Sequence, residues 1–371
     1  MDRARLAHRL WHSTSPAARV ARAALLPAAA LYRAGVAVRN AAFDLGVLPA
    51  RGLPRPSLGV GNIAVGGVGK TPVAAYLARE LARRGATPGI LLRGYGGSGG
   101  PGEGRRGEDG DEAEEHRSGT PGAAVVAERD RRRGAARAVA AGADVLVLDD
   151  CLQHRAVRPD VLLAVLAAES AAGPRWPLPA GPWREGLGAL ARCDGVVVTH
   201  KTAPAAAAAD AATRLAARTR AKLGVAVALE IGGLVPLTGG APLPARWLEG
   251  RAVTALSGIG EPELFGAQLE RLGATVHPLV FGDHHRYTAA EAAAIAARAG
   301  PDGAVVTTAK DAIRLRPVWP PGAPPCLVAE LSVRVTHGQD DLARLLDRLG
   351  RAAPQDTPIA AHGPLDQRDT P

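Results

Sequence analysis

The chain has 371 residues, of which 47% are hydrophobic and only 3% aromatic, and its formal net charge is +9. This length is sufficient for two domains of ordinary size. The three cysteines, Cys151, Cys193 and Cys326, are scattered and show no CxxC spacing. A disulfide framework and a zinc site are therefore not expected, and the cysteine content fits a reducing cytoplasm.

The excess positive charge is concentrated at the start of the chain. Residues 1–56 contain nine arginines and two acids, Asp2 and Asp44, which gives a local net charge of +7. The rest of the chain is close to electroneutral. We expect this basic leader to contact an anionic membrane surface; a basic disordered tail is the alternative. We predict no nucleic-acid partner and a monomeric protein.

Residues 17–48 are apolar, but four arginines interrupt them: Arg19, Arg22, Arg33 and Arg39. The longest uncharged run, residues 23–32, is far shorter than the roughly 20 residues that a membrane span requires. We therefore predict that residues 1–50 form a helical, membrane-associating segment that lies in the interface, with its arginines reaching toward the headgroups. A signal peptide and a helix packed on its own domain are the alternatives.

From Ser57 onward, short apolar runs alternate with helical patterns, which is typical of a parallel α/β architecture. The first strand is predicted at residues 57–60 and the first helix at residues 71–84, ended by Gly85. Further buried strands are predicted at residues 89–92, 144–148, 161–166 and 196–199, and an Ala-rich helix at residues 203–222. Residues 96–115 are rich in glycine and charge, which favours a mobile loop.

A cluster of glycine and proline at residues 234–244 predicts a domain boundary. Beyond it, strands are predicted at residues 252–256, 275–279, 304–307 and 326–329, and helices at residues 262–272 and 289–299. The expected organisation is a parallel-sheet domain at residues 51–235, a second, smaller α/β domain at residues 236–350 and a disordered tail at residues 351–371.

The strongest chemical signal lies between the first predicted strand and the first predicted helix. The segment reads Gly61-Asn62-Ile63-Ala64-Val65-Gly66-Gly67-Val68-Gly69-Lys70-Thr71-Pro72. Small residues allow backbone N–H groups to wrap a polyphosphate at a helix N-terminus. Lys70 is placed to reach the β- and γ-phosphates of ATP, and the Thr71 hydroxyl to ligate Mg²⁺. The segment predicts a P-loop NTPase-like domain, although the strict motif has glycine in place of Ala64; a turn that only packs a helix on a sheet is the alternative.

A second motif supplies carboxylates. The segment reads Val145-Leu146-Val147-Leu148-Asp149-Asp150, an apolar strand followed by two acids at the edge of the sheet where ligands bind. One carboxylate can bind Mg²⁺ directly or through its water shell, and the other can adjust the properties of that site. Alone this pattern is often a surface turn, but paired with a P-loop it indicates a Walker B strand.

These motifs resemble those of the tetraacyldisaccharide 4′-kinases, the lipid A kinase family. The resemblance runs in order from about residue 31 to residue 315. After the P-loop come Arg93-Gly94-Tyr95-Gly96-Gly97, Gly110-Asp111-Glu112, Asp149-Asp150-x-Leu152-Gln153-His154, Leu178-Pro179-Ala180-Gly181-Pro182-x-Arg184-Glu185, Gly258-Ile259-Gly260-x-Pro262, Phe281-x-Asp283-His284 and Lys310-Asp311-Ala312. Each block alone is weak evidence for the family, but the whole set in this order is specific for it.

The resemblance implies a phosphotransferase that uses ATP and Mg²⁺. Its acceptor would be a sugar hydroxyl of an acylated glucosamine disaccharide, met at the cytoplasmic face of the bacterial inner membrane. Asp111 would be the general base, acting with His284 of the second domain as a dyad. If the resemblance is set aside, the alternative interpretation is that Asp111 belongs to a solvated run of acidic residues and His284 to a surface turn.

The resemblance also implies how Mg²⁺ is organised: Asp149, Asp150 and Glu185 would hold it directly or through water. Apart from the resemblance, we predict that Arg93 contacts a phosphate of either substrate. Gln153 would touch substrate or position the metal loop.

A nucleotide switch of the partitioning or metallochaperone type is the main rival, because its P-loop is similar. The additional lysine of that group would fall at position 65, which is Val65. A guanine-reading Asn/Thr-Lys-x-Asp motif is also missing, since the segments at residues 199–202 and 308–311 lack the spacing.

Overall fold

The computed structural model describes residues 10–11, 13, 15–94, 110–171, 175–283, 285–300 and 303–352. In this part of the chain, one twelve-stranded sheet runs through the molecule. Its strand order is β10 (Thr275–Val280), β9 (Ala252–Ser257), β11 (Ala304–Thr308), β12 (Cys326–His337), β7 (Leu223–Pro236), β6 (Gly195–His200), β5 (Val161–Ala167), β1 (Ser57–Gly61), β4 (Val145–Leu148), β2 (Pro88–Leu92) and β3 (Ala124–Ala127), with β8 (Leu243–Pro244) paired to β7.

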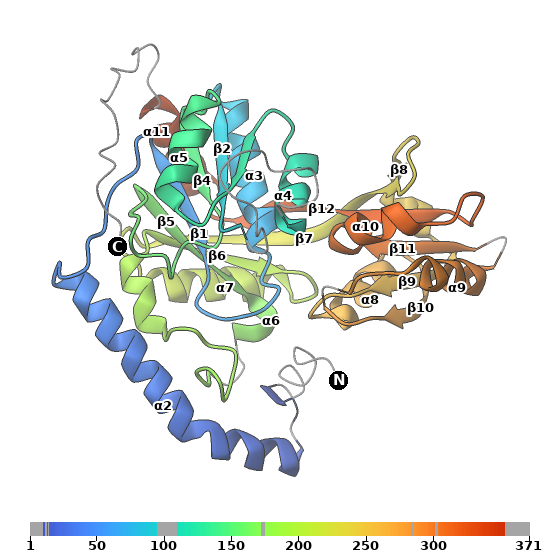
Figure 1. Cartoon of the computed structure of the whole chain (residues 1–371), viewed down its shortest axis with the longest axis horizontal. Coiled ribbons are helices and arrows are strands. Elements are labelled where there is room, and N and C mark those ends of the chain that lie inside the picture. The colour runs from blue at the N-terminus through green and yellow to red at the C-terminus, as the bar shows by residue number, and fades with distance from the viewer. Residues whose placement is uncertain are drawn as a thin grey trace, which may run out of the picture.

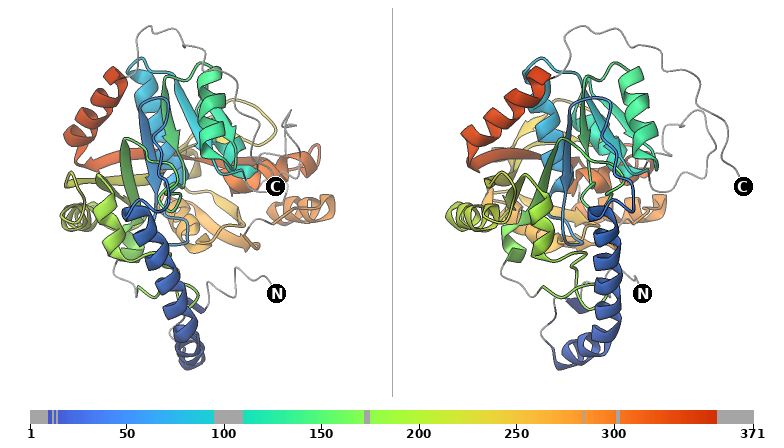
Figure 2. Two further views of the ribbon diagram at one scale, coloured as in Figure 1. Left: turned by 60° about the vertical axis from the view of Figure 1, so that its left-hand side comes forward. Right: turned by 90° about the vertical axis from the view of Figure 1, so that its left-hand side faces the viewer.

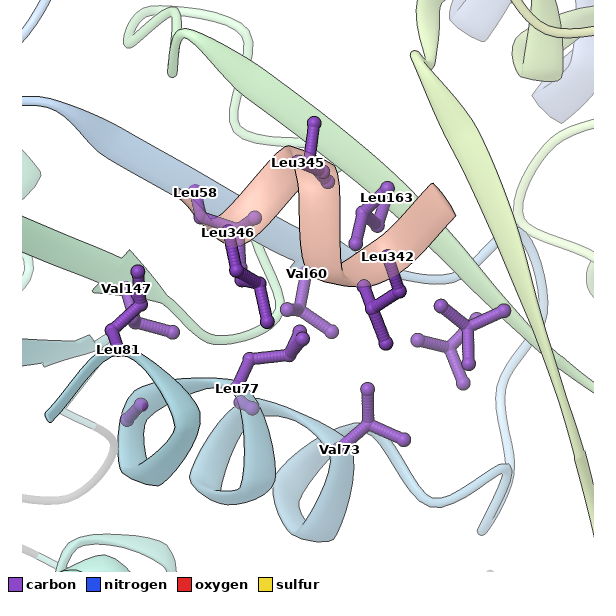
Figure 3. Packing of buried hydrophobic residues seen from close by; sticks show 14 of the residues in the cluster. Leu58, Val60, Val73, Leu77, Leu81, Val147, Leu163, Leu342, Leu345 and Leu346 are labelled. Carbon is purple, nitrogen blue, oxygen red and sulfur yellow. The ribbon is translucent and has the colours of Figure 1, made fainter. Parts of the chain in front are cut away.

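Strands β1 to β6 are parallel and, with the helices that cover them, form what we call the P-loop lobe. The helices and helical turns here are α3 (Lys70–Arg83), α4 (Asp111–Gly119), α5 (Arg131–Ala140), α6 (Ala168–Ala171), α7 (Ala205–Ala216) and a 3₁₀ turn at Leu187–Arg192. Helix α3 turns Val73, Leu77 and Leu81 onto the buried strands, as its spacing predicts (Figure 3).

The second lobe contains β9, β10 and β11, which are also parallel, and helices α8 (Pro262–Arg271), α9 (Ala289–Ala299) and α10 (Ala309–Leu315). Short 3₁₀ turns lie at Ala245–Leu248 and Arg316–Val318. The long antiparallel pair β7 and β12 extends from one lobe into the other (Figure 1). The predicted α/β class with a P-loop-like parallel sheet and an N-terminal apolar helix is confirmed.

The end of the chain departs from the predicted domain division. Helix α11 (Gln339–Ala352) returns to the P-loop lobe, where Leu342 and Leu346 share one core with Leu58 and Leu77 (Figure 3). The predicted C-terminal unit at residues 236–350 is therefore not self-contained. The predicted tail starts too early, because residues 351–352 finish this helix, and residues 353–371 lie outside the described residues.

The N-terminal helix α2 (Pro16–Asp44) begins at the N-cap Ser15, whose hydroxyl accepts a hydrogen bond from the Ala18 amide. It projects away from the sheet and meets the body at its C-terminal end (Figures 1 and 2). Three apolar side chains on one of its faces are strongly exposed: Val20 at 70%, Leu31 at 75% and Val38 at 71%. Among the described helices it alone is long and apolar enough to cross a membrane, judged by length and composition only.

Candidate active site

The P-loop lies between β1 and α3, at the carboxyl edge of the sheet. Gly69 has φ of +83°, and a Cβ there would lie 2.3 Å from the Leu229 side chain, so glycine is required. The Val65 amide donates to the Pro182 carbonyl at 2.7 Å, and the Thr199 hydroxyl donates to the Val68 carbonyl at 2.8 Å. These bonds fix the loop from two sides while α3 starts at its end, an arrangement suited to an anion.

Strand β4 pairs with β1 in parallel, so the two acids that follow it reach the same edge. Lys70 Nζ lies 3.5 Å from Asp150 Oδ1, and Arg184 Nη1 lies 3.2 Å from Asp150 Oδ2. Asp150 has φ of +50°, a left-handed conformation that aspartate tolerates better than most residues. The P-loop lysine and the Walker B acids are thus brought together.

Asp149 is buried, and its Oδ2 lies 3.1 Å from Nε2 of the buried His116 on helix α4. Burial opposes the charged carboxylate. The contact with His116, the charge of Lys70 and the neighbouring Thr71 side chain together outweigh burial and lower the pKa of Asp149. Asp149 is therefore ionised at neutral pH, the form in which a carboxylate can bind a cation.

His116→Leu is expected to lower the free energy of unfolding by about 1–3 kcal/mol, because it removes a hydrogen-bond partner from a buried carboxylate. Denaturant unfolding of the two proteins measures the difference. His277→Leu, at an exposed position on β10, is the control and should change stability by less than about 0.5 kcal/mol. An equal decrease in the free energy of unfolding in the two variants would contradict a stabilising role for the His116–Asp149 contact.

Glu185 is buried and surrounded by donors. Its Oε2 accepts hydrogen bonds from Asn40 and Arg192, both at 2.8 Å, and its Oε1 accepts one from Gln153 at 3.2 Å. Gln153 also donates to the Asn62 carbonyl at 2.8 Å. Glu185 and Gln153 therefore belong to one network that touches the P-loop, and their predicted roles toward metal and substrate stay predictions.

Asp111 is the first residue of α4, so residues 111–115 are helical rather than part of the predicted mobile loop, of which residues 96–109 lie outside the described residues. Arg314 of helix α10 donates Nε to Asp111 Oδ2 at 2.9 Å, and its Nη2 donates to the same oxygen. The contact joins the two lobes. The predicted partner of Asp111, His284, lies outside the described residues.

Arg93 follows β2 and is exposed at the same edge of the sheet, where it interacts with neighbouring groups. Its predicted contact with phosphate stays a prediction.

Three residues near the site were not found by sequence reasoning: His116, Lys201 and Arg314. Lys201 Nζ donates to the Gly67 carbonyl at 3.0 Å and to Glu261 of the second lobe at 2.7 Å. Its position directly after β6 was a usable signal, because strand ends meet at the ligand edge. The other two lie on helices, and no local pattern marks them.

The comparisons with known proteins agree with this geometry. A family model described as Tetraacyldisaccharide-1-P 4'-kinase matches residues 21–351. The chain is 40% identical over 360 residues to a tetraacyldisaccharide 4′-kinase of Anaeromyxobacter sp. (strain K), covering 92% of this chain and 94% of that protein. It is 40% identical over 317 residues to one of Aromatoleum aromaticum, covering 84% and 89%.

Among solved structures, the chain is similar to LpxK from Aquifex aeolicus in complex with ATP. The TM-score is 0.70 at 28% sequence identity, and the match covers 88% of this chain and 99% of that one. The resemblance found in the motifs is confirmed, and the chain belongs to the tetraacyldisaccharide-1-P 4′-kinase family.

Proposed function

We propose that this chain is a kinase that transfers the γ-phosphate of ATP to the 4′-hydroxyl of a tetraacylated glucosamine disaccharide 1-phosphate, a step of lipid A biosynthesis. Family membership supports the reaction. The structural observation that carries it is Lys70 at the start of α3, set against Asp149 and Asp150 at the carboxyl edge of the sheet. This arrangement suits the binding of a nucleotide triphosphate and the neutralisation of charge on the transferring group.

In this proposal, backbone amides from Gly66 to Thr71 bind the phosphates of ATP, and Lys70 leaves Asp150 to contact them. Asp149 fits a divalent cation, because its Oδ1 is buried and has no hydrogen-bond partner among the described residues. Thr71, Asp149, Asp150 and Glu185 are the residues that would organise Mg²⁺, which supplies charge neutralisation on the phosphates when bound.

Asp111 is the proposed general base, with His284 from the second lobe as its partner. A sugar hydroxyl is a poor nucleophile, so removal of its proton during attack assists transfer. Arg314 contacts Asp111 at the boundary between the lobes, and this position supports a role for the carboxylate toward an acceptor that binds between them.

The acylated acceptor and the projecting helix α2 support the proposal that the enzyme acts at a membrane surface. We propose the cytoplasmic face of the inner membrane, because ATP is available there. The exposed apolar face of α2, with arginines at its sides, fits the interface between headgroups and acyl chains. We propose a monomer that binds no nucleic acid.

ATP turnover measured with and without the acylated disaccharide tests the function. A kinase of this kind consumes ATP at a high rate only when the acceptor is present, and forms one phosphorylated lipid per ATP. Acceptor-independent turnover would support a partitioning or metallochaperone switch instead. That rival is not favoured, because the family match extends over residues 21–351.

Replacing Val20, Leu31 and Val38 together by glutamate is expected to reduce liposome binding more than tenfold. Burial of one such side chain contributes about 1.5–3 kcal/mol, and the new charges oppose the anionic surface. Flotation with anionic vesicles measures the change. Leu331→Glu, at an exposed position on β12 that is 43% accessible, is the control. Unchanged flotation of the triple variant would rule out this face as the membrane contact.

A further inference from the structure

The C-terminal end of helix α2 is fastened to the catalytic loops rather than to a remote surface. Asn40 Nδ2 donates to Glu185 Oε2 at 2.8 Å, and Arg39 Nη2 donates to the Gln153 carbonyl at 2.6 Å. Arg155, two residues beyond Gln153, donates to the Asn40 carbonyl at 2.9 Å and to the Asp44 carboxylate at 2.5 Å. The last turn of α2 is thus held by four polar contacts.

From Glu185 the contacts continue to the P-loop. Gln153 donates to Glu185 and accepts a hydrogen bond from Arg184 at 3.2 Å. Arg184 in turn pairs with Asp150, the partner of Lys70. An unbroken series of hydrogen bonds and ion pairs therefore links the end of α2 to the phosphate-binding lysine.

The orientation of Asn40 follows from this network. A carboxylate oxygen needs a donor, so the amide nitrogen must face Glu185. The amide oxygen is then buried with no hydrogen-bond partner among the described residues. A buried, unpartnered acceptor lowers stability, so packing alone does not favour this side chain. The charge-assisted bond to Glu185 opposes this cost and holds the Asn40 side chain in its orientation.

We propose that Asn40 is a positioning residue of the kinase site: helix α2 orients Glu185 through Asn40, in addition to binding the membrane. This inference rests on the proposed role of Glu185 in organising Mg²⁺. The rival is that α2 serves attachment alone, with Arg192 and Gln153 sufficient to orient Glu185. The two readings differ in detergent micelles, where enzyme and lipid substrate meet without a bilayer.

The test compares Asn40→Ala, the isosteric Asn40→Asp, Glu185→Gln and the control Thr213→Ala. Thr213 is exposed on α7, and its replacement by alanine removes only the hydrogen bond from its hydroxyl to the Ala209 carbonyl of the same helix. For each protein we would measure kcat and apparent KM in mixed micelles, flotation with anionic liposomes, melting temperature, and ATP binding with and without Mg²⁺.

Asn40→Ala is expected to lower kcat about 10- to 100-fold, the usual effect of losing a partner that orients a metal-site carboxylate. Flotation and the apparent KM for lipid should stay unchanged, and the gain in ATP affinity on adding Mg²⁺ should shrink. Asn40→Asp should be at least as impaired, because it sets a second carboxylate against Glu185 while keeping the size of the side chain. Thr213→Ala should behave as the parent.

A kcat for Asn40→Ala within twofold of the parent, with Glu185→Gln impaired, would overturn the inference and leave the proposed function intact. Loss of flotation with normal micelle activity would assign Asn40 to attachment and overturn it too. Unfolding of both Asn40 variants would mean that Asn40 serves stability alone. If Glu185→Gln leaves kcat and Mg²⁺-dependent ATP binding unchanged, Glu185 does not organise the metal, and the inference loses its basis.

Discussion

Lys70→Ala is expected to lower kcat by at least about 10²- to 10³-fold, because it removes a fixed positive charge from the site where charge moves during phosphoryl transfer. Thermal stability should change little. The side chain is 15% exposed, and its contact with Asp150 spans 3.5 Å; such pairs contribute about 0–1 kcal/mol. Arg184 stays as a partner for Asp150 in the variant.

Initial rates of phosphorylated lipid formation at saturating ATP measure this effect, with a melting curve for each protein. Arg334→Ala is the matched control, since it also removes a cation paired with a carboxylate, Glu230, at 2.5 Å but outside the site. The control should retain the parent rate. A Lys70→Ala enzyme with near-normal turnover would refute the assignment of this loop to phosphate binding.

Asp111→Asn is expected to lower kcat by about 10²- to 10⁴-fold, or roughly 3–5 kcal/mol in activation free energy, the usual contribution of a general base. The apparent KM for ATP should change little, because the nucleotide is bound by other groups. The amide keeps the size of the side chain, so contact with Arg314 is weakened rather than replaced by a cavity.

If Asp111 and His284 act as one unit, the double variant with Asp111→Asn and His284→Ala should be little worse than the worse single variant. Single-turnover rates of the three variants give the comparison. Glu114→Gln, on the same helix and paired only weakly with Arg117 at 3.6 Å, is the control. Fully additive losses would show separate roles, and a normal rate for Asp111→Asn would point to the neighbouring Asp109 instead.

Local patterns were sufficient for much of this fold. Strands β9, β10 and β11 and helix α9 lie within about one residue of the predicted ranges, since each combines a short apolar run or helical period with a glycine or proline stop. The P-loop and the Walker B acids were equally accessible, because their chemistry depends on residues adjacent in the chain.

The pairing of strands and the packing of helices that lie far apart in the chain could not be predicted from local patterns. Strand β7 continues through Gly232 and Gly233 to Pro236, and so enters residues 234–244, where a domain boundary was predicted. In the structure Gly232 lies at a register shift opposite β12, so the glycine accommodates an irregularity inside a strand. Helix α11 was also missed, although Leu342, Leu345, Leu346 and Leu349 recur at helical spacing and give a local signal for it. What the sequence does not show is that these leucines pack on a helix more than 250 residues earlier in the chain.

By itself, the amino-acid sequence determined the parallel α/β class, the P-loop, the paired acids and the family, because each of these depends on short-range order. Only the tertiary structure decided which residues meet. His116 reaches Asp149, Arg314 reaches Asp111 from the other lobe, and Asn40 joins the N-terminal helix α2 to Glu185. These partners are 33 to 203 residues apart in the chain, and no local period relates them; sheet pairing and helix packing bring them into contact.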